Sequence, residues 1–332
     1  MNQTLLTRLF KTIEGNRDTP LMKVAYSIIE DEKSKGHDKL ADQLLTILRE
    51  NIERTEKNRT TFKVLKESLH HIPVDRRYKL PLATFVEHEH LRHKMVLSPE
   101  VESKILRIEK EYLASERLAH HGLKPRKKIL LYGSSGCGKS MAAERIAWNL
   151  GLPFYKVRFD SIISSYLGES ASNLQNLFES MKDYPCVLLL DEFDIIGKQR
   201  DTKANDIGEI HRIVNILLGL LEEYDGAGIL IATTNLEGSL DKALFRRFDD
   251  FIELPKPNQN EIMELLQTSF SALKLNKSVK LTQYAKKMGG LSYAIIVKIA
   301  NDAAKKAVIN SRQEISIDDL NKALGENLAL NR

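Results

Sequence analysis

The sequence predicts an α/β fold in which a doubly wound parallel sheet carries helices on both faces, with further helical regions before and after it. Short β-rich runs alternate with helical segments between residues 123 and 255, and this alternation is typical of parallel strands joined by helices. No β-rich run follows Pro257, and residues 258–327 have the periodicity of four helices. The expected strands are Ile129–Tyr132, Phe154–Arg158, Val187–Leu190, Ile229–Thr233 and Phe251–Leu254.

Four regions follow one another along the chain in this interpretation. Residues 1–53 are expected to be helical, because their apolar residues recur at helical spacing. A small helical domain of this kind is typically an adaptor or an oligomer brace. Residues 54–122 are a polar connector and then one long charged helix, which Ser98 caps. Residues 123–255 are the α/β core, and residues 256–332 are a helical lid.

The composition is that of an ordinary globular protein. Of the 332 residues, 29% are charged and 42% are hydrophobic, and the formal net charge is +5. Basic and acidic residues are interleaved, so the charge neither requires nor excludes a nucleic-acid partner. No apolar run approaches the roughly 18 residues that a membrane span needs, and the N-terminus lacks a signal segment. We therefore expect a cytoplasmic protein with no membrane association. Its two cysteines, Cys137 and Cys186, are not expected to form a structural disulfide.

A glycine-rich stretch from Gly133 to Ser140 matches the whole phosphate-loop pattern G-x-x-x-x-G-K-[ST]. It follows an expected strand and precedes an expected helix, and this context favours a phosphate loop over an ordinary Gly/Ser-rich turn. Backbone N–H groups of such a loop bind phosphate oxygens at the positive end of a helix dipole. Lys139 would contact the terminal phosphates, and the Ser140 hydroxyl would bind Mg²⁺. The residues predicted to bind the nucleotide are Gly133, Ser134, Ser135, Gly136, Cys137, Gly138, Lys139, Ser140 and Met141.

Polar side chains also follow two other expected strands. Asp191 and Glu192 come directly after Val187–Leu190, so both carboxylates would lie at the edge of the sheet where α/β folds bind ligands. Asp191 would bind Mg²⁺, directly or through water, and Glu192 would polarise the attacking water. The alternative, a strand capped by solvated acids, is weakened by the phosphate loop upstream. Asn235 follows a strand expected between the other two; it could orient the attacking water or contact the γ-phosphate, although taken alone it is more simply a turn residue.

Arg246 and Arg247 stand at the end of a short expected helix. The guanidinium group is a planar donor that is always charged, which suits the charge that develops on a transferred phosphate. For arginines in general, a surface salt bridge is the commoner role.

These four elements, in this order, resemble the AAA family of ATPases, in the branch that contains katanin, spastin and the proteasomal ATPases. The short arginine element and the segment Lys35–Ala41 are similar to those of small stand-alone bacterial members. The resemblance implies an ATPase that binds ATP with Mg²⁺ and forms a homo-oligomer, a hexameric ring. It also implies that Arg246 or Arg247 is an arginine finger that acts on ATP held by the neighbouring subunit. The family usually separates the two arginines by Pro-Gly, and here they are adjacent, so either could be the finger.

Further segments match features of the same family. Tyr166-Leu167-Gly168 matches the aromatic–aliphatic–glycine pore loop, in which Tyr166 and Leu167 would grip an extended polypeptide. Without the family, Tyr166 is simply a semi-buried loop aromatic. Gly290–Ala294 resembles the start of the lid helix that contacts the base and ribose, and residues 200–208 are either a second pore loop or a solvated loop.

Two clusters are interpreted without a catalytic role. The histidines of His88–His93 lack the H-E-x-x-H spacing and a completing cysteine or carboxylate pair, so we expect a solvated segment rather than a metal site. The basic run Lys124–Lys128 precedes the first core strand and would at most border the nucleotide.

The sequence therefore predicts an ATP-driven protein remodeller or unfoldase that threads polypeptide through the pore of a ring. No G-x-S-x-G protease signature is present, so any proteolysis would come from a separately encoded protease. The alternatives are a DNA-directed ATPase, such as a transposition or loading factor, and a scaffold in which nucleotide only holds an assembly together. The aromatic loop at Tyr166 argues against the DNA-directed alternative.

Overall fold

The computed structural model consists of two compact units, residues 1–70 and residues 71–332. In the first unit, residues 38–49 are helical, and the buried side chains of Leu44 and Leu48 belong to its apolar core. The other helices expected in this region lie largely outside the described residues, and the domain boundaries at residues 53 and 122 stay predictions. The described residues are 25, 28–29, 32–33, 35–49, 72–75, 79–162, 169–192, 207–235, 246–271, 273–276 and 278–329.

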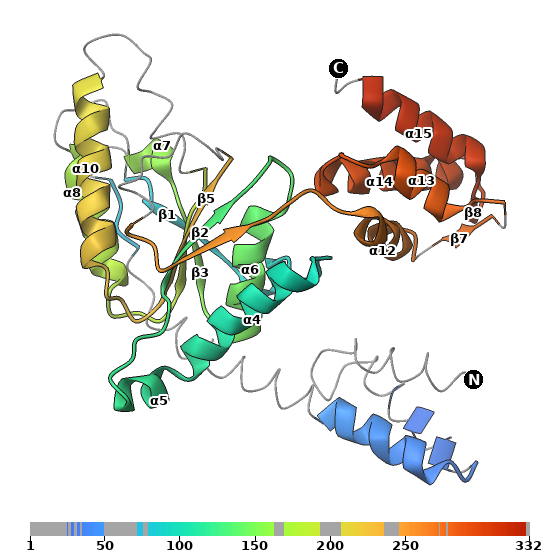
Figure 1. Ribbon diagram of the computed structural model, residues 1–332, viewed down its shortest axis with the longest axis horizontal. Helices are drawn as coiled ribbons and strands as arrows, with labels where there is room; N and C mark the ends of the chain where they lie inside the picture. Colours follow the sequence, from blue (N-terminus) through green and yellow to red (C-terminus); the bar gives the residue numbers. More distant parts are fainter. Residues whose placement is uncertain are drawn as a thin grey trace. The chain divides into compact units, whose positions relative to one another are not determined.

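The described part of the second unit contains a six-stranded, mostly parallel sheet with helices on both faces, which confirms the predicted α/β fold (Figure 1). The strand order is β1-β3-β4-β5-β2-β6, so β5 lies between β4 and β2 as expected. The strands are β1 (Ala83–Val86), β2 (Lys128–Tyr132), β3 (Phe154–Val157), β4 (Val187–Leu190), β5 (Ile229–Thr234) and β6 (Asp250–Glu253).

The central strands β4 and β5 are buried along their whole length. Strands covered on both faces are continuous apolar runs, which explains why the sequence predicts these two well. Their parallel pairing places Leu190 beside Ala232, and the pairing of β5 with β2 places Thr234 beside Tyr132. This register brings the carboxyl ends of all three strands to one edge of the sheet.

The edge strand β1 is not predicted by the sequence. It pairs antiparallel with β3, with Ala83 opposite Val157 and Val86 opposite Phe154, so the sheet is not purely parallel. Its four residues do not alternate between buried and exposed positions, and the strand depends on a partner far along the chain. The sequence around Ala83–Val86 therefore contains no local signal for β1.

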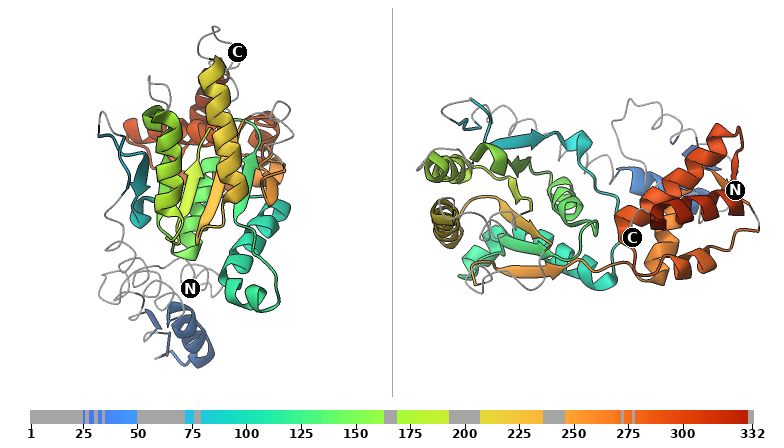
Figure 2. Two further views of the ribbon diagram at one scale, coloured as in Figure 1. Left: turned by 90° about the vertical axis from the view of Figure 1, so that its left-hand side faces the viewer. Right: turned by 90° about the horizontal axis from the view of Figure 1, so that it is seen from above.

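Two pairs of helices cover the two faces of the sheet (Figure 2). On one face, α4 (Pro99–Leu113) and α6 (Lys139–Leu150) pack together and share an apolar core with the strands. On the other face, α8 (Glu169–Met181) packs against α10 (Ile207–Glu223), and α7 (Phe159–Ile162) contacts α8.

The single long helix expected before the core is broken at Ala114. Ser98 caps the start of α4 as expected, because its Oγ accepts a hydrogen bond from a backbone N–H of the first turn at 3.3 Å. Ala114 has a φ of −96° and a ψ of 13°, and α5 (Ser115–His120) begins after it. The Ser115 hydroxyl donates to the Tyr112 carbonyl oxygen. A side chain that competes in this way for a backbone acceptor favours a bend or break.

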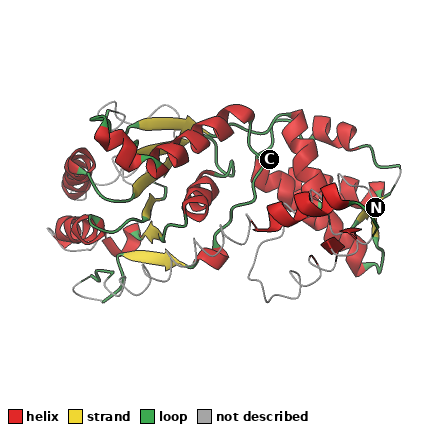
Figure 3. Cartoon of the chain, turned by 90° about the horizontal axis from the view of Figure 1, so that it is seen from below, coloured by secondary structure: helices red, strands yellow, loops and turns green. Residues whose placement is uncertain are grey.

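The lid contains four helices within its described residues, as the sequence predicts, and one short strand pair that it does not (Figure 3). The parallel strands β7 (Lys274–Leu275) and β8 (Glu314–Ile315) have two residues each, too few for a periodic signal. None of the helices among the described residues is both long and apolar enough to span a membrane. The lid helices are α12 (Gln259–Ser269), α13 (Leu281–Lys287), α14 (Tyr293–Ile309) and α15 (Ile317–Ala329).

The lid begins with a capping box at Asn258. Its Oδ1 accepts hydrogen bonds from Asn260 N at 2.9 Å and Glu261 N at 3.0 Å, and Glu261 Oε2 accepts one from Asn258 N at 3.0 Å. These bonds satisfy N–H groups that the first turn of α12 would otherwise leave without a partner.

We expect Asn258→Ala to lower the free energy of unfolding by about 1 kcal/mol, because α12 loses its cap. Urea titration followed by far-UV circular dichroism measures the change. Asn260→Ala is the matched control, since the Asn260 side chain is exposed. Equal losses in the two variants would contradict a stabilising role for the cap.

Candidate functional site

The parallel register brings three predicted elements together at one edge of the sheet. The phosphate loop follows β2, Asp191 and Glu192 follow β4, and Asn235 follows β5. These three strands are neighbours in the sheet, so their carboxyl ends are adjacent. Ligands bind at this edge in open α/β sheets.

Close packing explains two of the glycines in the phosphate loop. Gly133 has a φ of 131°, and a Cβ atom there would overlap the Leu254 carbonyl oxygen. Gly136 has a φ of 75°, and a Cβ atom there would lie 2.8 Å from Ser292 Oγ and 3.1 Å from Ala294 Cβ. The Gly136 carbonyl oxygen accepts a hydrogen bond from Ala294 N at 3.0 Å. Glycine therefore lets the loop contact the start of the lid helix α14 directly.

Lys139 is buried, with 8% of its surface exposed. Its ammonium group donates to Gly133 O at 2.7 Å, to Ser134 O at 2.9 Å and to Asn235 Oδ1 at 2.8 Å. A buried ammonium needs such acceptors, because the loss of water disfavours its charge. The same network holds the predicted side chains Lys139 and Asn235 side by side, and phosphate oxygens are acceptors of the same kind.

Asp191 is the centre of a second network. Its Oδ1 accepts hydrogen bonds from Ser140 Oγ at 2.8 Å and Thr233 Oγ1 at 2.6 Å, and its Oδ2 accepts one from Lys156 Nζ at 2.6 Å. Burial raises the pKa of Asp191, but the three hydrogen bonds and the Lys156 charge hold that pKa below its ordinary value. The carboxylate is thus ionised at neutral pH. Carboxylate and hydroxyl oxygens are hard ligands of the kind that Mg²⁺ takes, so Asp191 and Ser140 fit this ion.

Sequence reasoning missed two members of this network, Thr233 and Lys156. Thr233 Oγ1 donates to Asp191 and accepts a hydrogen bond from Glu192 N at 2.9 Å, but its sequence context is only that of a strand residue. Lys156 interrupts the apolar run of β3, but its side chain is half exposed, so its sequence context is equally that of a solvent-facing strand residue.

The backbone of Glu192 is in the left-handed region, with a φ of 53°. This conformation is uncommon for residues that carry a Cβ atom, and such strain clusters at functional sites. The Glu192 side chain is exposed and lies in the wall of the cavity described next.

A cavity of about 810 Å³ lies between the phosphate loop and the lid. Its core wall consists of Ser135–Met141 with the polar side chains at the strand ends, and its lid wall includes Leu265 of α12 and Tyr293 of α14. Met95 and Val96, before α4, form a third wall. The volume is ample for a small-molecule ligand. No motif marks the connector wall, because its residues meet the phosphate loop only in the folded chain.

The predicted arginine pair lies at the other edge of the sheet. Arg246 and Arg247 precede the amino end of β6, which runs parallel to β2, whereas the phosphate loop follows the carboxyl end of β2. Arg246 is exposed, and Arg247 Nη2 lies 3.1 Å from Glu222 Oε2. Both arginines are described residues, and neither lines the cavity at the phosphate loop of its own chain.

The predicted pore loop, Tyr166, Leu167 and Gly168, lies outside the described residues. Residues 200–206 of the second predicted loop also lie outside them. Both assignments stay predictions.

The histidine segment before α4 is partly solvated as expected, because His90 is exposed, but His88 and His93 are half-buried against the core. The rings of His93 and His88 both stack on Trp148, with centroid distances of 3.9 Å and 5.7 Å. Stacking on an indole from α6 is a tertiary contact that the spacing of the histidines does not reveal. Among the described residues, no group of three or more His, Cys, Asp or Glu side chains could hold a metal ion.

The basic run Lys124–Lys128 does not border the nucleotide cavity. It leads into the amino end of β2, at the edge of the sheet opposite the phosphate loop. Lys124 Nζ lies 3.1 Å from Asp225 Oδ2, and Lys128 Nζ lies 3.8 Å from Asp249 Oδ1. The expectation failed because the length of β2 separates the run from the loop.

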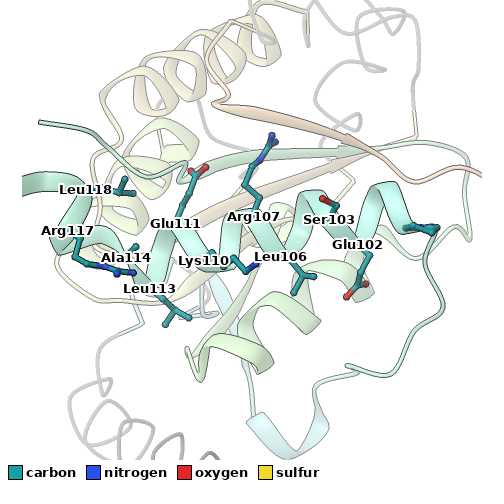
Figure 4. A pocket seen from close by; sticks show the side chains of 11 residues that line it. Glu102, Ser103, Leu106, Arg107, Lys110, Glu111, Leu113, Ala114, Arg117 and Leu118 are labelled. Carbon is teal, nitrogen blue, oxygen red and sulfur yellow. The ribbon is translucent and has the colours of Figure 1, made fainter. Parts of the chain in front are cut away.

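A second hollow, of about 830 Å³, follows one face of α4 and α5 (Figure 4). Leu106 and Leu113 line it together with the basic side chains of Lys110 and Arg117. It contains none of the predicted site residues. The cavity at the phosphate loop is therefore the candidate site, although the two hollows have similar volumes.

Comparison with known proteins matches residues 129–256 to the ATPase family associated with various cellular activities (AAA). The chain is similar to an uncharacterized AAA family ATPase of Sinorhizobium fredii, with 35% identity over 93% of this chain and 90% of the relative. The ATP-dependent zinc metalloprotease FtsH of Helicobacter pylori is 35% identical over 64% of this chain and 35% of its own length. The 26S proteasome regulatory subunit S10B homolog B of Arabidopsis thaliana is 33% identical over 65% of this chain and 56% of its own length.

We expect Gly136→Ala to weaken nucleotide binding about tenfold or more, because overpacking of this kind costs about 1–3 kcal/mol. Titration with a fluorescent ADP measures the affinity. Gly290→Ala is the matched control: Gly290 also has a positive φ, of 82°, but a Cβ atom there meets nothing within 4 Å. If both variants lost affinity equally, backbone strain alone would be responsible and contact with the lid would not matter.

Proposed function

The chain belongs to the AAA family of ATPases and hydrolyses ATP, and on this premise we propose that it uses hydrolysis to remodel or unfold proteins as a ring-shaped homo-oligomer, a hexamer. The observation that carries the proposal is the meeting of Lys139, Asn235, Ser140 and Asp191 at one edge of the sheet. Similarity to FtsH and to a proteasomal regulatory subunit supports a protein substrate.

Each side chain at the site has a proposed role. Lys139 binds the terminal phosphates of ATP, and Asn235, its hydrogen-bond partner, orients the attacking water. Ser140 and Asp191 hold Mg²⁺, which neutralises charge on the phosphate oxygens when it is bound. Glu192 polarises the attacking water and takes its proton.

The arginine finger acts in trans in this proposal. Arg246 and Arg247 lie at the edge of the sheet away from the phosphate loop of their own chain, so they are suited to complete the site of a neighbouring subunit. A guanidinium supplied in this way stabilises the charge of the transition state. One subunit then contributes Lys139, Asp191 and Glu192, and the next contributes the arginine.

The lid transmits the state of the nucleotide. Ala294 of α14 donates a hydrogen bond to Gly136 in the phosphate loop, so a change in the loop would reach the lid directly. Hydrolysis moves the lid against the sheet, and the pore loop at Tyr166 and Leu167 follows and pulls a polypeptide segment. A separately encoded protease in a bacterial cytoplasm is the proposed downstream partner.

A DNA-directed ATPase is the alternative, and the surface ion pairs of the basic run do not exclude it. Two of its lysines, Lys124 and Lys128, pair with Asp225 and Asp249. A DNA-binding surface needs cations that can exchange counterions for phosphates. Duplex DNA therefore enters the test below as a competing activator.

We expect an unfolded polypeptide to stimulate steady-state ATPase activity and Tyr166→Ala to abolish that stimulation. The physical reason is the loss of an aromatic face that packs against any side chain. Tyr166→Phe is the matched control and should keep the stimulation, because it retains the ring. Stimulation by duplex DNA alone, with no effect of Tyr166→Ala, would reject the threading proposal in favour of a DNA-directed ATPase.

Either Arg246→Ala or Arg247→Ala removes the finger. We expect that variant to lower kcat about a thousandfold or more, as removal of an arginine finger does in other enzymes. Lys139→Ala should also be inactive. Mixing the two inactive variants should recover part of the activity, because a wild-type arginine then faces a wild-type phosphate loop at some subunit boundaries. The arginine whose variant complements Lys139→Ala is the finger. No recovery with either variant, in a mixture shown to exchange subunits, would contradict a shared site.

A further inference from the structure

Lys156 occupies an unusual place in the sheet. The other three residues of β3 are buried, whereas half of the Lys156 side chain is exposed. Its ammonium group nevertheless lies 2.6 Å from Asp191 Oδ2, and only 12% of the Asp191 side chain is exposed. A lysine on the surface of a strand that had no ion-pair partner would extend into water, where its charge is best solvated.

The two oxygens of Asp191 have different partners. Oδ1 accepts hydrogen bonds from the hydroxyl groups of Ser140 and Thr233, and Oδ2 accepts one from Lys156. A divalent cation that uses Oδ2 must displace the ammonium group or bind beside a like charge. Lys156 can withdraw, because its stem is flexible and half of it already faces water.

A second cation close to Asp191 is already neutralised. Arg92 donates to Glu144 Oε2 from its backbone N and from its Nε, each at 2.9 Å, and its charge faces that carboxylate. Among the described residues, the cationic side chain that is hydrogen-bonded to Asp191 is that of Lys156.

We propose that Lys156 is a positioning residue that holds Asp191 in place and competes with the divalent cation for its Oδ2 atom. Lys156 thereby sets the cation concentration at which the ATP site becomes loaded. This inference rests on the proposed assignment of Asp191 to magnesium. It extends that assignment to a residue on a neighbouring strand which contacts the carboxylate and lies outside the phosphate-loop motif.

The test measures cation binding directly. Mn²⁺, a paramagnetic substitute for Mg²⁺, is titrated into the full chain with saturating ADP, and free Mn²⁺ is followed by electron paramagnetic resonance. We expect Lys156→Met to lower the Kd for Mn²⁺ about two- to fivefold, the size expected for one partly exposed ion pair. Met retains the apolar stem and removes the charge. Lys156→Arg, which keeps the charge, should behave like the wild type.

A second control removes a lysine elsewhere. Lys182→Ala deletes an exposed side chain in the turn before β4, away from the carboxyl edge of the sheet, and it should leave the Kd for Mn²⁺ unchanged. Thermal unfolding verifies that each variant is folded, and Lys156→Gln replaces Lys156→Met if the latter is not. An unchanged or raised Kd in the folded charge-removing variant overturns the inference.

Asp191→Asn separates failure of this inference from failure of its premise. If Asp191→Asn weakens Mn²⁺ binding while Lys156→Met leaves it unchanged, Asp191 is the ligand and the role of Lys156 is wrong. If Asp191→Asn binds Mn²⁺ as tightly as the wild type, the proposed magnesium site itself is wrong, and the inference falls with it.

Discussion

The parallel pairing of β4, β5 and β2 is the constraint on which the site depends. It places Leu190 beside Ala232 and Thr234 beside Tyr132, so the residues that follow these strands meet although they are far apart in sequence. A shift of the register by one residue would turn every side chain of a strand to the opposite face. The buried apolar length of β4 and β5 fixes that register, and hence fixes where Lys139, Asn235 and Asp191 can meet.

The charges of Lys139 and Asp191 at this edge are tolerated because both side chains are hydrogen-bonded within the fold. Lys139 has three acceptors, and Asp191 has three donors from β3, α6 and β5. An unpaired buried charge would cost several kcal/mol or would neutralise by a pKa shift. The networks therefore hold both side chains in fixed orientations, which is the preorganisation that electrostatic catalysis requires.

How much the sequence predicts depends on whether a feature is local. The strands β4 and β5 are continuous apolar runs, and the phosphate loop is a pattern of consecutive residues. Their prediction therefore needs no tertiary information. The edge strand β1, the stacking of His93 on Trp148 and the Asp191 contact of Lys156 each need a partner far along the chain. The break at Ala114 is not predicted for a different reason. It depends on a side-chain hydrogen bond from Ser115, which helix propensities do not reveal.

Tyr293 shows how the lid can respond to a ligand in the cavity. Its side chain packs against the apolar core that the sheet shares with α4 and α6, and it lines the cavity. Its hydroxyl donates to Glu261 Oε2 at 2.8 Å. Glu261 also closes the capping box of α12 through Asn258 N. A displacement of Tyr293 by a ligand would therefore act on α14 and on the first turn of α12 together. A backbone hydrogen bond from Ala294 N to the Gly136 carbonyl oxygen also links the lid to the phosphate loop, and its net contribution of about 1 kcal/mol is small compared with the binding energy that a nucleotide can supply. The Tyr293 ring thus couples the start of α14 to the start of α12, so the proposed lid motion would involve both helices.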